Sequence, residues 1–105
     1  MSAEFAKPYN YKVAWKQQAG PTSYTSGGFD ISLPELKRIH FAVAMFSGAR
    51  PSNYVYQLDV SWSVNRVRVT VMRIDVTATA PAAWTEVPAG TDLSGLTFSV
   101  IAIGE

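Results

Sequence analysis

Any chemistry in this chain would have to come from one histidine, eight acidic side chains and nine basic ones, because the 105 residues include no cysteine. His40 lies in the middle of an alternating strand pattern, without the base and orienting group that a nucleophile needs. A lone strand histidine is typical of a structural or surface residue. The acidic residues are scattered singly, which disfavours a metal site. We therefore expect no catalytic residue, no metal, no cofactor and no small-molecule substrate.

Charged residues also alternate along the most regular strand pattern. We place Asp59 and Asp75 on its outward face together with three arginines, which are Arg66, Arg68 and Arg73. A surface charge network is the interpretation we favour over a glycosidase carboxylate pair. The functional alternative is a docking surface for an acidic protein patch or a phosphate backbone. Nucleic acid is the weaker of these two partners, because the net charge is only +1 and no aromatic residue interleaves with the arginines.

Most of the aromatic residues fall on predicted inward phases of strands, but Tyr24 and Trp84 fall in segments with loop composition. Exposed loop aromatics are used to anchor a partner or to stack on a sugar. Trp84 could instead cap one end of the fold. Tyr24 and Trp84 join the three arginines as candidate partner-binding residues.

The elements that position these residues are organised around one hairpin, residues 54–78. Apolar residues occupy every second position from Tyr54 to Trp62 and again from Val67 to Val71, which is typical of paired strands. A turn at 63–66 places Trp62 opposite Val67 and makes Trp62 a core residue. The phase changes at Met72, which predicts a β-bulge there.

Shorter alternating segments are predicted as strands at 9–16, 29–33, 39–46, 83–87 and 96–103, with loops at 18–28 and 47–53. In the first of these, the lysines are expected to point outward. Residues 1–8 form an N-terminal arm, and residues 9–105 form a single domain of ordinary size. Six to seven short strands without a long helix predict an all-β fold, an antiparallel β-sandwich.

Two strands are apolar on both faces. Ile101 and Ile103 are opposite in phase to Phe98, Val100 and Ala102, and His40, Ala42, Ala44 and Phe46 form a second face on residues 39–46, which predicts a central or covered strand. Charged residues make up only 16% of the chain, below the usual value of about 25%. We therefore predict a homo-oligomer joined through apolar strand faces, with three candidate interface residues: Phe46, Ile101 and Ile103.

The N-terminal sequence lacks the apolar core of a signal peptide, and no apolar run approaches the ~20 residues that span a bilayer. We expect synthesis in a cytoplasm and no membrane partner.

The segment WTEVPAGTDLSGLTFSVIAIG, residues 84–104, resembles the closing segment of small all-β structural proteins of tailed bacteriophages and related viruses. Residues 28–31 and 39–43 are similar in the same way, so that the resemblance covers roughly residues 24–104. It implies a virion accessory part, such as a capsid decoration (cement) protein, a turret or a fibre head. Such proteins are usually oligomeric, and a trimer at capsid three-fold positions is the implied number. A second family with a similar rhythm is the H-type lectins.

Our first hypothesis is a non-enzymatic, capsid-decoration type of protein that binds the major capsid protein, associates with itself and resides in the virion. The alternative is a carbohydrate-binding module on a phage tail or fibre. The two differ in a structural feature. A decoration protein needs a broad, flat apolar face made of strands, whereas a lectin needs a concave loop site with Tyr24 or Trp84 beside a carboxylate.

Overall fold

The structure is a computed structural model that describes residues 11–49, 51–77 and 83–105. It is all-β, as predicted, with two antiparallel sheets packed as a sandwich. The predicted N-terminal arm lies outside the described residues. Within the described ranges, no helix is long and apolar enough to cross a membrane. The seven strands are β1 (Lys12–Ala19), β2 (Phe29–Ser32), β3 (Ile39–Gly48), β4 (Tyr54–Ser63), β5 (Arg66–Asp75), β6 (Thr85–Glu86) and β7 (Leu96–Gly104).

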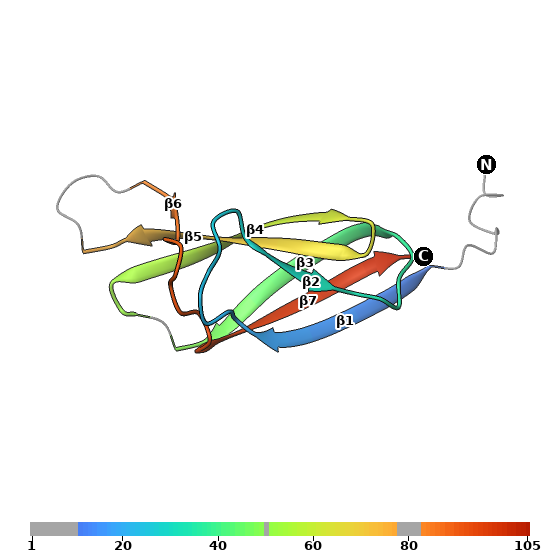
Figure 1. Ribbon diagram of the computed structural model, residues 1–105, viewed down its shortest axis with the longest axis horizontal. Coiled ribbons are helices and arrows are strands. Elements are labelled where there is room, and N and C mark those ends of the chain that lie inside the picture. Colours follow the sequence, from blue (N-terminus) through green and yellow to red (C-terminus); the bar gives the residue numbers. More distant parts are fainter. Residues whose placement is uncertain (1–10, 50, 78–82) are drawn as a thin grey trace.

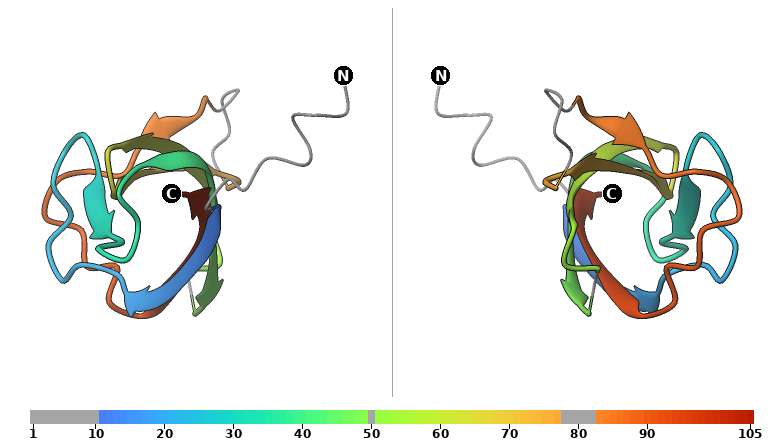
Figure 2. Two further views of the ribbon diagram at one scale, coloured as in Figure 1. Left: turned by 90° about the vertical axis from the view of Figure 1, so that its right-hand side faces the viewer. Right: turned by 90° about the vertical axis from the view of Figure 1, so that its left-hand side faces the viewer.

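The first sheet has the strand order β1-β7-β3, and the second has the order β2-β5-β4 with β6 paired to β5. In Figure 1, β7 and β1 of the first sheet run obliquely below the β4–β5 hairpin. Seen along the strands, the two sheets enclose the interior between them (Figure 2). The predicted short strand near residues 83–87 is confirmed as β6.

The predicted register of the central hairpin is confirmed. Trp62 pairs with Val67 and Leu58 pairs with Val71, and the turn consists of Val64 and Asn65. Val64 has a positive φ of 56°, which is unfavourable for a β-branched residue. The carbonyls of Val64 and Asn65 accept hydrogen bonds from the amides of Ile39 and Leu33, and these contacts to the β2–β3 connection stabilise the strained turn.

The predicted bulge at Met72 is wrong. Pairing between β4 and β5 continues without a shift from Ser63↔Arg66 to Tyr54↔Asp75. Residues 67, 69, 71, 73 and 75 therefore share one face, because side chains alternate along a regular strand. The apolar pattern changes phase here because the end of β5 extends past the core, where Met72 and Ile74 are only half-buried.

Trp62 is not the core residue that its pairing predicted. Its side chain is 38% exposed, and its ring packs edge-on against Phe41 with 5.9 Å between centroids. Trp62 lies one residue from the end of β4, beside the turn. Alternation assigns it to the inward phase, but at this end of the hairpin that phase is not covered by the other sheet.

β7 is the central strand of its sheet, and its apolar residues divide between the two faces as predicted, although the outer face, which we expected to be covered, is exposed. Leu96, Phe98, Val100 and Ala102 are buried, whereas Ile101 and Ile103 are on the outer face. β3 was predicted to be central or covered, but it is an edge strand that pairs with β7 alone. Its inward residues pack against β4, which follows it in the chain, and this explains their apolar character.

The orientation predicted for β1 is inverted. Ala14 is buried, Val13 and Trp15 are exposed, and Lys16 is on the inward phase. The parity follows from pairing with β7, because Ala14 lies opposite Ala102 and Lys16 opposite Val100. At this open edge the Lys16 side chain leaves the interior and donates to the carbonyl of Ser32 at 3.3 Å. Inward-pointing charge on an edge strand discourages pairing with other chains.

A chain of aromatic rings joins the two sheets in the core. Tyr24 contacts Phe29, Phe29 contacts Phe98, and Phe98 contacts Phe46, which also packs on Tyr56. Three of the four contacts are edge-to-face and the fourth is tilted, with centroids 5.1 to 6.5 Å apart, in the range that favours aromatic pairs. The core is thus filled mainly by side chains of β2, β3, β4, β5 and β7.

Candidate interaction surface

The outer face of the β1-β7-β3 sheet consists of apolar cross-strand rows. In the first row, Val13 lies opposite Ile103, which lies opposite Phe41 on the other side. The second row is Trp15, Ile101 and Val43 in the same arrangement. The third contains Gln17, Ser99 and Met45. None of these nine side chains is charged.

These apolar side chains are open to solvent. Seven of them have exposed fractions between 39% and 70%: Val13, Trp15, Phe41, Val43, Met45, Ile101 and Ile103. We call these seven residues the apolar face. Side chains of this size at these fractions expose on the order of 700 Å². The largest apolar patch on a typical monomer is roughly 300–600 Å².

The outer face of the other sheet has a different chemistry. Gln57, Asp59 and Ser61 on β4 lie opposite Met72, Thr70 and Arg68 on β5. On the far side of β5, Asp30 of β2 pairs with Arg68. This polar, mixed-charge surface is ordinary for a soluble domain, so the contrast identifies the apolar face as the unusual feature of the molecule.

Two of the three predicted interface residues belong to the apolar face, and one does not. Ile101 and Ile103 lie in its middle strand. Phe46 is on the opposite side of β3, where its ring packs against Tyr56 and Phe98 in the core. The prediction for Phe46 is therefore wrong, because β3 directs the face with Ala42 and Ala44 toward the other sheet.

The remaining five residues of the apolar face were not identified from the sequence. Val13, Trp15 and Phe41 were assigned to inward phases because bulky apolar residues alternating with polar ones usually indicate a core. The sequence feature that could have identified them is β7, in which Leu96, Phe98, Val100 and Ala102 clearly face inward. Residues that pair with Ile101 and Ile103 lie on the same face of the sheet as these two isoleucines. Their partners on β1 and β3 must therefore be exposed as well.

The three arginines do not form one docking stripe. Arg68 donates from Nε and Nη2 to the two carboxylate oxygens of Asp30, at 3.1 and 3.3 Å. Arg73 lies on the opposite face, with its guanidinium carbon 4.0 Å from the centroid of the Tyr54 ring. Arg66 is exposed near the hairpin turn, in a shallow hollow that Trp62 and Asp30 also line. Arg66 is the only member of the stripe left available for a partner.

The carboxylates of Asp59 and Asp75 are also separated, contrary to the shared face expected from the sequence. Asp59 pairs with Thr70 on the outer face, whereas Asp75 shares the face of Arg73. Asp75 accepts hydrogen bonds from the amide and hydroxyl of Thr77, which hold the pKa of its carboxyl below its usual range. A surface charge network across the hairpin is therefore not formed.

Tyr24 is buried, contrary to its prediction as an exposed loop aromatic, with only 1% of its surface open. Its hydroxyl donates to Oε2 of Glu86 at 2.8 Å and accepts from the amide of Val71 at 3.1 Å. Burial raises the pKa of Tyr24 to about 12, and the hydrogen bond to Glu86 acts in the same direction. Tyr24 therefore attaches the loop that precedes β2 to strand β5.

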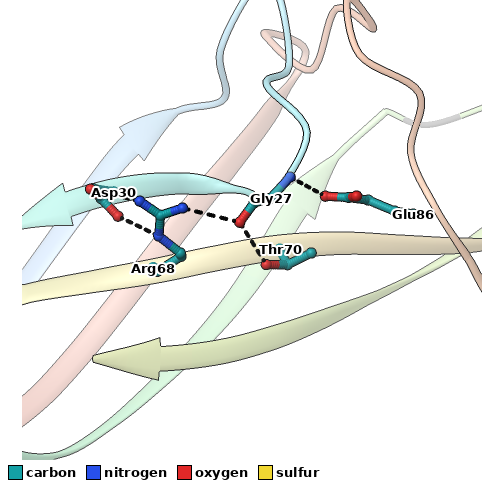
Figure 3. Close-up of polar contacts among 5 residues, drawn as sticks. All are labelled: Gly27, Asp30, Arg68, Thr70 and Glu86. Atoms are coloured by element: carbon teal, nitrogen blue, oxygen red, sulfur yellow. Dashed lines mark hydrogen bonds and ion pairs between the residues drawn. The ribbon is translucent and has the colours of Figure 1, made fainter. Parts of the chain in front are cut away.

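Glu86 also binds the loop that precedes β2 and holds it against the β4–β5 hairpin. Its Oε2 also accepts from the amide of Gly27 at 2.7 Å, while the carbonyl of Gly27 accepts from Arg68 and Thr70 (Figure 3). The hydrogen bonds from Tyr24 and Gly27 hold the pKa of Glu86 below its usual range. The cluster joins β2, β5 and β6, and every polar group in it has a partner. It is a structural clamp, which sequence reasoning missed because Glu86 is distant in sequence from Gly27.

Trp84 is 43% exposed, as expected for a loop aromatic. It lines an open hollow between β3 and β4 together with Met45, Phe46, Tyr56 and Leu58. No carboxylate lines this hollow among the residues that the structure describes. Tyr24 and Trp84 are therefore not brought together into a concave site.

His40 lies at the rim of the apolar face. Its Nε2 is 2.9 Å from Oε2 of Glu105, which Arg38 also contacts, and these two partners hold the pKa of Glu105 below its usual range. The ring of Tyr11 packs edge-on against His40. Across the described ranges, no cluster of three or more His, Cys, Asp or Glu side chains could hold a metal ion.

Comparison with known proteins finds no matching family model, no matching curated protein and no matching solved structure.

Proposed function

We propose that this chain is a non-enzymatic structural protein of the capsid-decoration type, which associates with itself and binds the major capsid protein of a virus. The observation that carries the proposal is the apolar face, seven large apolar side chains with exposed fractions of 39% to 70% on three adjacent strands. Exposed patches of this kind are typical of protein–protein interaction sites. Residence in a virion comes from the resemblance of residues 24–104. We do not carry over the three copies that the resemblance implies, because two identical faces in contact join copies in pairs.

The polar chemistry of the described residues supports the same proposal. The Glu86 clamp is fully hydrogen-bonded within the fold, and His40 and Arg38 are engaged with Glu105. In the Glu86 clamp the hydroxyl of Ser26 donates to Oε1 of Glu86 at 3.3 Å. The hydrogen bonds from Tyr24 and Gly27 hold the pKa of this carboxyl low, which makes it a weak general base for that hydroxyl. An apolar face built of strands is also the feature that we expected of a decoration protein, whereas a lectin needs a concave loop site.

The experiment is to purify virus particles from the source of the chain on a density gradient and to quantify their proteins by mass spectrometry. We expect the chain in the particle band, at a fixed ratio to the major capsid protein that washing in high salt does not change. Recovery of the chain only in the soluble fraction would contradict the proposal. So would binding of a glycan that is lost in Trp84→Ala, because the hollow beside Trp84 would then be a sugar site.

A further inference from the structure

We propose that the apolar face is covered by further copies of this chain, packed sheet against sheet with Ile101 near the centre of the contact. The inference rests on the proposed structural function and assigns a partner to its surface. It assigns no surface to the capsid protein.

The size of the apolar face fits a contact between copies. A standard stable interface buries about 800 Å² on each partner. The seven side chains supply on the order of 700 Å², and two neighbouring aromatic residues extend the surface. Trp62 packs on Phe41 at one margin, and Tyr11 lies beside His40 at one end. The apolar face is therefore large enough to hold two copies together without another protein.

The charge distribution also favours an identical partner. The three rows of the sheet contain no charged side chain, so an acidic or basic partner would gain no ion pair there. A second apolar face loses no charge hydration on contact, and a net charge of +1 produces little repulsion between copies. Symmetric oligomers use such self-complementary surfaces. At the rim, Glu105 is already paired with Arg38 and His40, so closing the contact leaves no unpaired carboxylate.

The sheet geometry places the centre of the contact. Sheets stack face to face about 10 Å apart. Ile101 belongs to the middle strand and to the middle row, between Trp15 and Val43. A group attached at Ile101 therefore meets the partner sheet, whereas a group on the other sheet stays in solvent.

The absence of native cysteine makes a direct test possible, because one introduced thiol is then unique. We choose Ile101→Cys, with Val55→Cys as the matched control. Val55 is an exposed apolar residue on the outer side of β4, and its exposed fraction of 40% is close to the 39% of Ile101. Each full-length variant is treated at low micromolar concentration with a bis-maleimide whose reactive ends are about 10 Å apart, the spacing of stacked sheets.

We expect most of the Ile101→Cys protein to appear as a covalent dimer on a denaturing gel, and Val55→Cys to remain at the mass of one chain. Equal labelling of both variants with a monofunctional maleimide in denaturing urea confirms that each carries one reactive thiol. No cross-linked product from Ile101→Cys would overturn self-association through this face. The proposed function would still stand if the chain is found in particles, because a capsid protein would then cover the face. Cross-linking of Ile101→Cys with no chain in particles would instead overturn the proposed function alone.

Discussion

Tyr24 shows how a single hydroxyl holds two distant segments together. It accepts from the buried amide of Val71 and donates to Glu86, so that its removal leaves the amide without a partner. An unsatisfied buried donor costs about 1–3 kcal/mol. We expect Tyr24→Phe to lower the free energy of unfolding by about that amount, measured by urea denaturation.

The matched control is Tyr54→Phe. The ring of Tyr54 packs against Arg73, and its hydroxyl makes no hydrogen bond to the residues that the structure describes. We expect a change below about 0.5 kcal/mol, as for an ordinary surface substitution. An equal loss in both variants would show that the hydroxyl of Tyr24 has no special role.

Glu86 adds a pH dependence to this clamp. Its pKa is lowered in the folded state by hydrogen bonds from Tyr24 and Gly27. The stabilisation from a lowered carboxyl pKa is complete above the unfolded value of about 4.3 and is lost as the pH falls through the folded value. In Glu86→Gln we expect lower stability at pH 7 and a smaller difference from the wild type at pH 3. Urea midpoints at the two pH values measure this. A constant difference would mean that the charge of Glu86 contributes nothing.

At the scale of elements, the loop before β2 approaches β5 too closely for a side chain. A Cβ on Gly28 would lie 2.5 Å from the carbonyl oxygen of Val69, and its φ is +105°. We expect Gly28→Ala to combine a steric clash with an unfavourable φ and to cost well over 1 kcal/mol, which is a drop in Tm of more than about 4 °C.

Gly90→Ala separates these two causes. Gly90 also has a positive φ, of +88°, but a Cβ there would have open space around it. We expect Gly90→Ala to lower the free energy of unfolding by about 1–2 kcal/mol, the cost of the unfavourable φ alone. If both variants melt at the same temperature, close approach of the loop to β5 does not contribute to stability.

The sequence correctly predicted the strands in which the residues themselves determine which face is buried. In the β4–β5 hairpin, alternation on both arms and a short turn leave one register, and the structure has that register. β7 was assigned correctly because its inward face is apolar along the whole strand, whereas the outer face also carries Thr97 and Ser99. β1 was not, since Val13 and Trp15 alternate with Lys12 and Lys16 as a core strand would. A surface that is buried only on assembly has the same pattern as a core.

The site was predictable to a smaller extent than the fold, for a related reason. Ile101 and Ile103 could be identified because they lie on the strand that also carries the core residue Phe98. Phe46 was assigned to the wrong side, because the packing of β3 on β4 is not visible in the sequence. The pairing of Arg68 with Asp30 and of Glu86 with Gly27 joins distant segments, and no local pattern indicates such contacts.

At the scale of the whole molecule, the two sheets present different surfaces. One outer face is mixed in charge, with Asp30 and Arg68 paired across it. The other exposes seven apolar residues on three strands. A small domain with one such surface is suited to the self-association that we propose.

The measurement that tests self-association most directly is the mass in solution by sedimentation velocity, with Ile101→Lys and Val55→Lys as the matched pair of variants. For the wild type at micromolar concentration we expect two or more times the 11.5 kDa mass of one chain. We expect Ile101→Lys to sediment as a folded monomer and Val55→Lys to sediment as the wild type does. Circular dichroism confirms folding, and Val13→Lys at the edge of the same face serves if Ile101→Lys does not fold. A wild-type mass of one chain, or an oligomer unaffected by a lysine on the apolar face, would contradict association through this surface.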